Sequence, residues 1–171
     1  MTDYTHFTVT PAIQVLATKS RDSTIPGHVL SQVHQKMGVF LGQHLVGLVG
    51  LEEIEFEHVQ GIRKGPAISI RNHIVILPLM RAGLFAGLGI WDVLPSAAFV
   101  PITPTREKDL SDSEIKGLPS LTEKIVIIAD AVINTGDSLE PVLRWIQNQN
   151  PHQVIVCSLV TPIPTAERLA S

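Results

Sequence analysis

The stretch IVIIADAVINTGDSLEPVL, residues 125–143, runs from an apolar segment through one acidic residue and a polar loop into an amphipathic segment. Its opening run of β-branched residues does not alternate with polar ones, which is typical of a strand covered on both faces of a parallel sheet. Apolar residues then recur three or four apart, which predicts a helix over about 139–147. This succession of strand, loop and helix favours an α/β fold.

The rest of the sequence repeats this succession of strands and helices. Helical spacing of apolar residues predicts a long helix with Pro26 in its first turn. Glutamates alternate with apolar residues at 52–57, which predicts a half-exposed strand and, with the segment that follows, a β-hairpin arm. In order, the predicted elements are a helix at 26–49, hairpin strands at 52–62 and 63–71, a strand at 73–79, a helix at 83–94, strands at 96–103 and 124–130, the helix at 139–147 and a strand at 153–161.

These elements define one α/β domain. Helices that connect parallel strands form right-handed crossovers. We therefore expect a mainly parallel twisted sheet flanked by helices, with an N-terminal helix and a β-hairpin arm, in a single domain over residues 1–171. Residues 1–25 are assigned to an N-terminal extension.

Composition and charge argue against several classes of protein. The net charge of −3 does not suit a surface built to bind nucleic acid. The single cysteine, Cys157, cannot form an internal disulfide, and its apolar neighbours suit a buried thiol in a reducing compartment. The N-terminal residues lack a signal-peptide pattern, and no apolar run approaches the ~18 residues of a membrane span. We expect a cytoplasmic protein with no nucleic-acid or membrane partner.

Ligands of open parallel sheets bind beyond the carboxyl ends of the strands. Three segments follow strands in this way, at 78–83, 101–109 and 129–138. In the third, the amides of residues 135–138 open a helix, where free N–H groups and the helix dipole favour an anion. Asp130 is placed to accept hydrogen bonds from vicinal hydroxyls or to approach a metal. A phosphate at one end and a diol acceptor at the other describe a cradle for a ribose 5-phosphate.

The same loop has a purely structural interpretation. The residues Asn-Thr-Gly-Asp-Ser are also typical of a turn followed by a helix N-cap. Asp137 is able to cap the helix, and Glu140, three residues later, is able to complete a capping box with it. Composition alone leaves phosphate binding and helix capping open.

Three segments, in order along the chain, resemble one enzyme family. ADAVINTGDS (129–138) is similar to the phosphoribosyl-diphosphate (PRPP) motif of type I phosphoribosyltransferases. PLMRAGLFAGLGIWDVLPSA (78–97) resembles the Pro-Ile-Leu-Arg-Ala-Gly region of uracil phosphoribosyltransferases. TREKD (105–109) falls where that family has an arginine followed by acidic residues. The similarity extends over about residues 26–162.

The resemblance implies a PRPP site with assigned roles. Arg81 and Arg106 would hold the diphosphate, since guanidinium groups bind such anions through two parallel hydrogen bonds. Asp130 and Arg106 would act in catalysis, and residues 104–123 would form a flexible hood over the reacting centre. The PRPP-binding residues implied are Arg81, Ala82, Gly83, Arg106, Asp130, Ala131, Val132, Ile133, Asn134, Thr135, Gly136, Asp137 and Ser138. The alternatives are a surface ion pair for Arg81 and an ordinary exposed charge for Arg106.

The implied reaction is attack of a nucleobase nitrogen on C1 of PRPP with release of diphosphate, as when uracil becomes UMP in pyrimidine salvage. Magnesium would enter with PRPP, held mainly by substrate oxygens, so we assign no metal-binding residue. PRPP and a nucleobase are the expected small-molecule partners. Two alternatives stay open: a non-catalytic PRPP- or nucleotide-binding regulatory protein, and a relative that keeps only the fold.

Several positions bear on how far the family pattern applies. Ala131 stands where many type I enzymes carry a second acid, although the uracil branch also has one acid. Asp137 stands where the uracil branch has glycine, and we expect its carboxylate to point outward. The sequence ends ten residues after Thr161, before the family's Gly-Asp-Ala-Gly-Asp segment that recognises uracil, so the base-binding residues are unknown.

The hairpin also has two interpretations. It resembles the arm that relatives use in dimer contacts, which implies a homodimer or a higher homo-oligomer. Its alternating glutamates equally suit a plain solvated edge.

Overall fold

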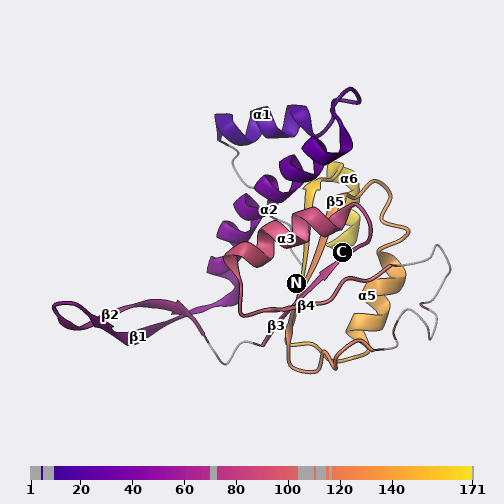
Figure 1. Cartoon of the computed structure of the whole chain (residues 1–171). Helices are drawn as coiled ribbons and strands as arrows, with labels where there is room; N and C mark the ends of the chain where they lie inside the picture. The colour runs from indigo at the N-terminus through magenta and orange to yellow at the C-terminus, as the bar shows by residue number, and fades with distance from the viewer. Residues whose placement is uncertain are drawn as a thin grey trace.

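The structure is a computed structural model in which four parallel strands form a central sheet flanked by helices (Figure 1). It describes residues 5, 10–69, 73–103, 110, 115 and 117–170. The predicted α/β class is confirmed, including the mainly parallel sheet and the separate antiparallel hairpin.

The central sheet has the strand order β4-β3-β5-β6, and every neighbouring pair is parallel. β4 pairs with one edge of β3, and the next strand along the chain, β5, pairs with the opposite edge of β3. The direction in which strands are added to the sheet therefore reverses between β3 and β5. In open α/β sheets a ligand crevice forms at such a reversal, beyond the carboxyl ends of the strands. The strands are β3 (Ile74–Pro78), β4 (Ala98–Phe99), β5 (Ile125–Val132) and β6 (Gln153–Val160).

Helices cover both faces of this sheet, as Figure 1 shows. Helices α2 (Gly27–Val49) and α3 (Gly83–Val93) pack on one face, and α5 (Glu140–Gln147) packs on the other. Successive residues of a strand point to opposite faces, so β3 and β5 supply apolar side chains to two clusters. On the α2–α3 side these are Ile74, Ile76, Ile125 and Ile127, and on the α5 side Val75, Leu77, Val126 and Ile128. Burial on both faces explains the uninterrupted apolar runs of the sequence.

A hairpin is present as predicted, but its turn lies at residues 59–60, inside the segment predicted as the first strand, 52–62. Strands β1 (Leu51–His58) and β2 (Gly61–Ile68) pair antiparallel, with Leu51 opposite Ile68 and His58 opposite Gly61. The hairpin reaches away from the rest of the molecule (Figure 1), and most of its residues are exposed.

Two helices are absent from the sequence prediction. Helix α1 (Pro11–Lys19) lies in the N-terminal extension and packs on α2, and the hydroxyl of Thr10 caps its first turn by accepting from the Ile13 amide at 3.4 Å. Helix α6 (Ile163–Leu169) follows β6. Strand β4 is also shorter than the predicted 96–103, although a bridge between Leu79 and Ile102 continues the parallel pairing beyond it.

Candidate functional site

Two loops meet at the carboxyl ends of β3 and β5, where the strand order reverses. The Leu79 amide, just after β3, donates to the Ala129 carbonyl in β5 at 2.9 Å. The chain then turns and enters α3 at Gly83, whose amide donates to the Leu79 carbonyl at 2.8 Å. This turn, residues 79–83, therefore lies directly against β5, next to the part of the strand that contains Asp130.

Gly83 allows the close approach of the two loops. A methyl group placed on Gly83 would lie 2.2 Å from the Ala129 carbonyl oxygen and 3.1 Å from the Asp130 Cα. Carbon and oxygen atoms that are not bonded do not approach so closely. A glycine is therefore required where the Arg-Ala-Gly turn contacts β5, and it brings the predicted residues Arg81, Ala82 and Gly83 beside Asp130.

Arg81 is exposed at this turn. Its peptide bond with Met80 is cis, and its carbonyl accepts a hydrogen bond from the Leu84 amide at 3.3 Å. Among the residues that the structure describes, no carboxylate forms an ion pair with the Arg81 guanidinium. A surface ion pair therefore does not account for this arginine within that part of the chain.

Asp130 is half-buried near the end of β5. Burial raises the pKa of its carboxyl group, while hydrogen bonds from the amides of Ala131 and Val132 oppose that shift. The Ala131 amide donates to Asp130 Oδ1 at 2.7 Å. These two amides fix the carboxylate in place, and a carboxylate has further lone pairs with which to accept hydrogen bonds from a ligand.

The phosphate loop, residues 133–138, connects β5 to the turn before α5. Its first residue, Ile133, is buried, and its amide donates to the Val160 carbonyl of β6 at 3.1 Å. Gly136 has a φ of 82°, a conformation that favours glycine, and its carbonyl accepts from the amides of Leu139 and Glu140. Within the described ranges, no carbonyl or side chain accepts a hydrogen bond from the amides of residues 134–138. These donors are available to an anion.

The helix-capping interpretation of this loop is wrong. Helix α5 begins at Glu140 with Leu139 at the N-cap position, and no side chain makes a capping hydrogen bond there. Asp137 is exposed in the turn that precedes the helix. Glu140 pairs instead with Arg168 of α6. The polar residues of the loop therefore do not close the helix end.

Sequence analysis missed the contribution of α6 to the site. The Thr165 hydroxyl donates to the Asn134 carbonyl at 2.6 Å, and the Arg168 guanidinium donates to the Thr135 carbonyl and to the Glu140 carboxylate. Pro162 at the N-cap and a second proline in the first turn were the available signal for this helix, because proline is favoured at helix starts.

Some predicted site residues cannot be placed. Arg106 and most of the predicted hood, 104–123, lie outside the described residues. The described part of that segment includes Leu121, which is buried in the cluster on the α5 side of the sheet.

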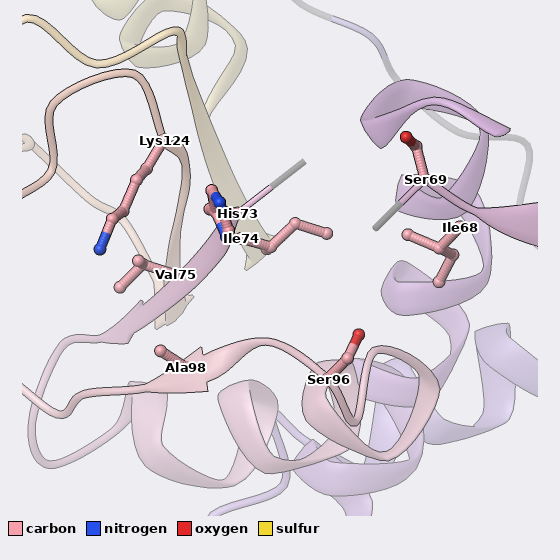
Figure 2. Close-up of a pocket in the computed structure, with 8 residues that line it drawn as sticks. All are labelled: Ile68, Ser69, His73, Ile74, Val75, Ser96, Ala98 and Lys124. Atoms are coloured by element: carbon pink, nitrogen blue, oxygen red, sulfur yellow. The ribbon is translucent and has the colours of Figure 1, made fainter. Parts of the chain in front are cut away.

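A hollow of about 270 Å³ lies at the opposite end of the sheet (Figure 2). It opens where β3, β4 and β5 begin, with His73 and Lys124 on its wall and Ser69 and Ser96 at its edge. The predicted site residues do not line it, so it is separate from the place where the two loops meet.

The described residues contain neither a candidate metal cluster nor a candidate membrane span. No group of three or more His, Cys, Asp or Glu side chains there is arranged to hold a metal ion. No helix there is long and apolar enough to cross a bilayer.

Known structures place this fold in a class of enzymes. A protein of Aquifex aeolicus superposes with a TM-score of 0.81 at 25% identity, covering 95% of this chain and 78% of that one. A hypoxanthine phosphoribosyltransferase of Staphylococcus aureus shares the fold with a TM-score of 0.51 at 13% identity, over 79% of this chain and 66% of that one. The fold is that of the type I phosphoribosyltransferases.

Sequence comparison identifies the family more narrowly. The family model for uracil phosphoribosyltransferase matches residues 7–171, and the chain belongs to this family. A uracil phosphoribosyltransferase of Aquifex aeolicus is 29% identical over 146 residues, which cover 84% of this chain and 70% of that relative.

Proposed function

We propose that this protein transfers ribose 5-phosphate from PRPP to a nucleobase, with uracil as the first acceptor to test and UMP and diphosphate as the products. Membership of the uracil phosphoribosyltransferase family supports the reaction class. The observation that supports the proposal is the contact of the Arg-Ala-Gly turn with β5, because this strand contains Asp130 and leads into the phosphate loop.

The phosphate loop supplies donors for the 5-phosphate of PRPP. The amides of Thr135, Gly136, Asp137 and Ser138 have no acceptor among the described residues and stand before the N-terminus of α5, where the helix dipole favours an anion. The Asp130 carboxylate then accepts hydrogen bonds from the ribose hydroxyls. Together these groups would hold the sugar in one orientation.

The diphosphate end of PRPP would lie toward Arg81. When the C1–oxygen bond breaks, its electron pair leaves with diphosphate, a nitrogen lone pair of the base forms the new bond to C1, and the proton of that nitrogen is released to the diphosphate or to water. Arg81 stabilises the departing charge, and Arg106 is proposed to share this role. Positioning and charge stabilisation account for catalysis here, and no protein nucleophile is required.

Magnesium fits this arrangement as an ion that arrives with the substrate. Mg²⁺ usually keeps several waters and takes one or two carboxylates together with phosphate oxygens. Asp130 is one carboxylate that this site offers, and the bound ion would neutralise charge on the diphosphate.

One observation favours a second function, PRPP binding without catalysis in a regulatory protein. An acidic residue, Asp137, stands in the phosphate loop and is exposed. The resemblance to the uracil branch implies glycine at this position. A ligand-binding protein tolerates a weaker substrate contact than an enzyme does.

The two functions are separated by one experiment. The protein is incubated with PRPP, Mg²⁺ and a panel of free bases that includes uracil, and diphosphate release is measured. The proposed enzyme releases diphosphate with at least one base and forms the matching nucleotide. PRPP binding without release for every base would contradict the enzyme and support the regulatory alternative.

We further propose that the hairpin mediates a homo-oligomer. Its outer part carries exposed apolar side chains, at Ile54, Phe56, Val59 and Ile62. Light scattering coupled to size exclusion tests this, and a monomer at micromolar concentration would contradict it.

A further inference from the structure

Helix α6 contacts one side of the phosphate loop. Figure 1 shows α6, in yellow, near the carboxyl end of β5. Thr165 and Arg168 lie three residues apart and therefore project from the same side of the helix. Both donate to backbone carbonyls of the loop, Thr165 to Asn134 and Arg168 to Thr135. A methyl group placed on Gly136 would lie 3.2 Å from Arg168 Nη2, so the loop and the helix are in direct contact.

These two hydrogen bonds fix the direction of the loop amides. In a trans peptide the carbonyl of one residue and the N–H of the next point in opposite directions. Both peptide bonds concerned are trans, because the only cis bond among the described residues joins Met80 and Arg81. With the carbonyls of Asn134 and Thr135 held by α6, the N–H groups of Thr135 and Gly136 point away from α6, toward the open side of the loop.

Arg168 also compensates a charge at the start of α5. The Glu140 carboxylate stands in the first turn of that helix, where a phosphate dianion would bind, and like charges there repel. Arg168 pairs with this carboxylate. The pair is about half-exposed, at 48% and 47% of the two side chains, so solvent screens it only in part.

We infer that Thr165 and Arg168 are positioning residues for the 5-phosphate of the activated sugar. Thr165 and Arg168 orient two loop amides toward the phosphate, and Arg168 in addition removes the repulsion from Glu140. This inference rests on the proposed function, since it assigns a role in binding the same substrate. It extends the PRPP site to α6, which the sequence motifs do not include.

The test compares four variants by calorimetric titration with PRPP and Mg²⁺. Thr165→Val and Arg168→Met remove the donors to the loop. Thr18→Val and Arg21→Met are matched controls, because Thr18 and Arg21 also donate to backbone carbonyls, within and just after α1 and away from the sheet. We expect Kd for PRPP to rise about tenfold in Thr165→Val and tenfold or more in Arg168→Met, with the controls unchanged.

Two further variants separate positioning from a general structural role. Thr165→Ser keeps the hydroxyl and is expected to restore wild-type affinity. Glu140→Gln combined with Arg168→Met removes the repelling carboxylate and is expected to recover part of the lost affinity. Steady-state kinetics should show a higher KM for PRPP with little change in KM for the base. A variant that loses affinity only in proportion to its melting temperature would contradict the inference.

The outcomes distinguish the two levels of the proposal. If the wild-type protein does not bind PRPP, the proposed function itself is wrong. If the wild type binds PRPP and Thr165→Val and Arg168→Met bind it equally well, the inference about α6 alone is overturned. Should Arg168→Met fail to fold, the comparison of Thr165→Val with Thr165→Ser decides the question.

Discussion

Replacement of Gly83 by alanine tests the contact that joins the two loops of the site. The added methyl group would lie 2.2 Å from the carbonyl oxygen of Ala129 and 3.1 Å from its carbonyl carbon. Even close carbon–oxygen contacts in proteins are about 3.3 Å or longer. The start of α3 would therefore have to move about 1 Å away from β5, since both clashing atoms belong to the backbone and no side chain is able to rotate aside.

This displacement has a cost in stability and a larger cost in function. Overpacking of a buried site typically costs about 1–3 kcal/mol, and for a domain of this size each kcal/mol lowers the melting temperature by about 2–4 °C. We therefore expect Gly83→Ala to melt about 2–12 °C below the wild type. Because a misplacement of about 1 Å in a catalytic site reduces the rate by about 100-fold, kcat/KM for PRPP should fall by that order.

The assay pairs thermal unfolding with PRPP-dependent kinetics at a temperature where the variant is folded. Gly47→Ala is the control, because Gly47 lies exposed in α2 and a methyl group there meets nothing within 4 Å. Alanine is preferred over glycine in a helix by about 1 kcal/mol, so this control should melt slightly higher than the wild type and keep its activity. Wild-type stability and wild-type kinetics in Gly83→Ala would refute the claim that this contact sets the site.

Three further predictions concern single side chains. Because burial raises the pKa of Asp130, the folded protein loses stability as pH rises through that pKa. Asp130→Asn should therefore melt higher than the wild type at pH 7, lose this advantage near pH 4, and no longer bind PRPP. A melting advantage that is independent of pH would contradict the raised pKa of Asp130. Arg81 is exposed and makes no ion pair with the described residues, so Arg81→Met should leave the free energy of unfolding unchanged within about 0.5 kcal/mol. The same substitution should weaken PRPP binding at least tenfold, and wild-type affinity in the variant would contradict the role of Arg81. Burial raises the pKa of Cys157 to about 12, so this thiol should resist alkylation at pH 8 in the native protein and react once the protein is unfolded. Rapid alkylation of the native protein would contradict the burial of Cys157 in the core.

The order of elements could be predicted because the local patterns were strong. β3, β5 and β6 each contain at least four consecutive apolar residues, and the apolar residues of helices α2, α3 and α5 recur at helical spacing. Asp130 and the phosphate loop could be proposed as candidate site residues because they lie at the carboxyl end of a strand in a sheet of this class. Arg81 could be proposed because it stands between an apolar strand and a glycine-containing turn, and in the structure the glycine of that turn, Gly83, packs on Ala129.

The features that sequence analysis missed depend on contacts between distant parts of the chain. The hydroxyl of Thr165 and the guanidinium of Arg168 reach carbonyls about thirty residues earlier, and nothing local in PIPTAERL indicates this. Glu140 has the right spacing for a capping box with Asp137, yet a tertiary ion pair with Arg168 takes its carboxylate instead. Side-chain partners of this kind follow from how the helices pack, which local patterns do not specify.

The central claim is that the Arg81 turn and the loop from Asp130 to Ser138 form one PRPP site. Calorimetric titration of the wild-type protein with PRPP, with and without Mg²⁺, tests it most directly. We expect saturable binding of one PRPP per chain, stronger with Mg²⁺ and lost in both Asp130→Asn and Arg81→Met. No heat of binding and no thermal shift at millimolar PRPP would contradict it, as would tight binding that survives both substitutions.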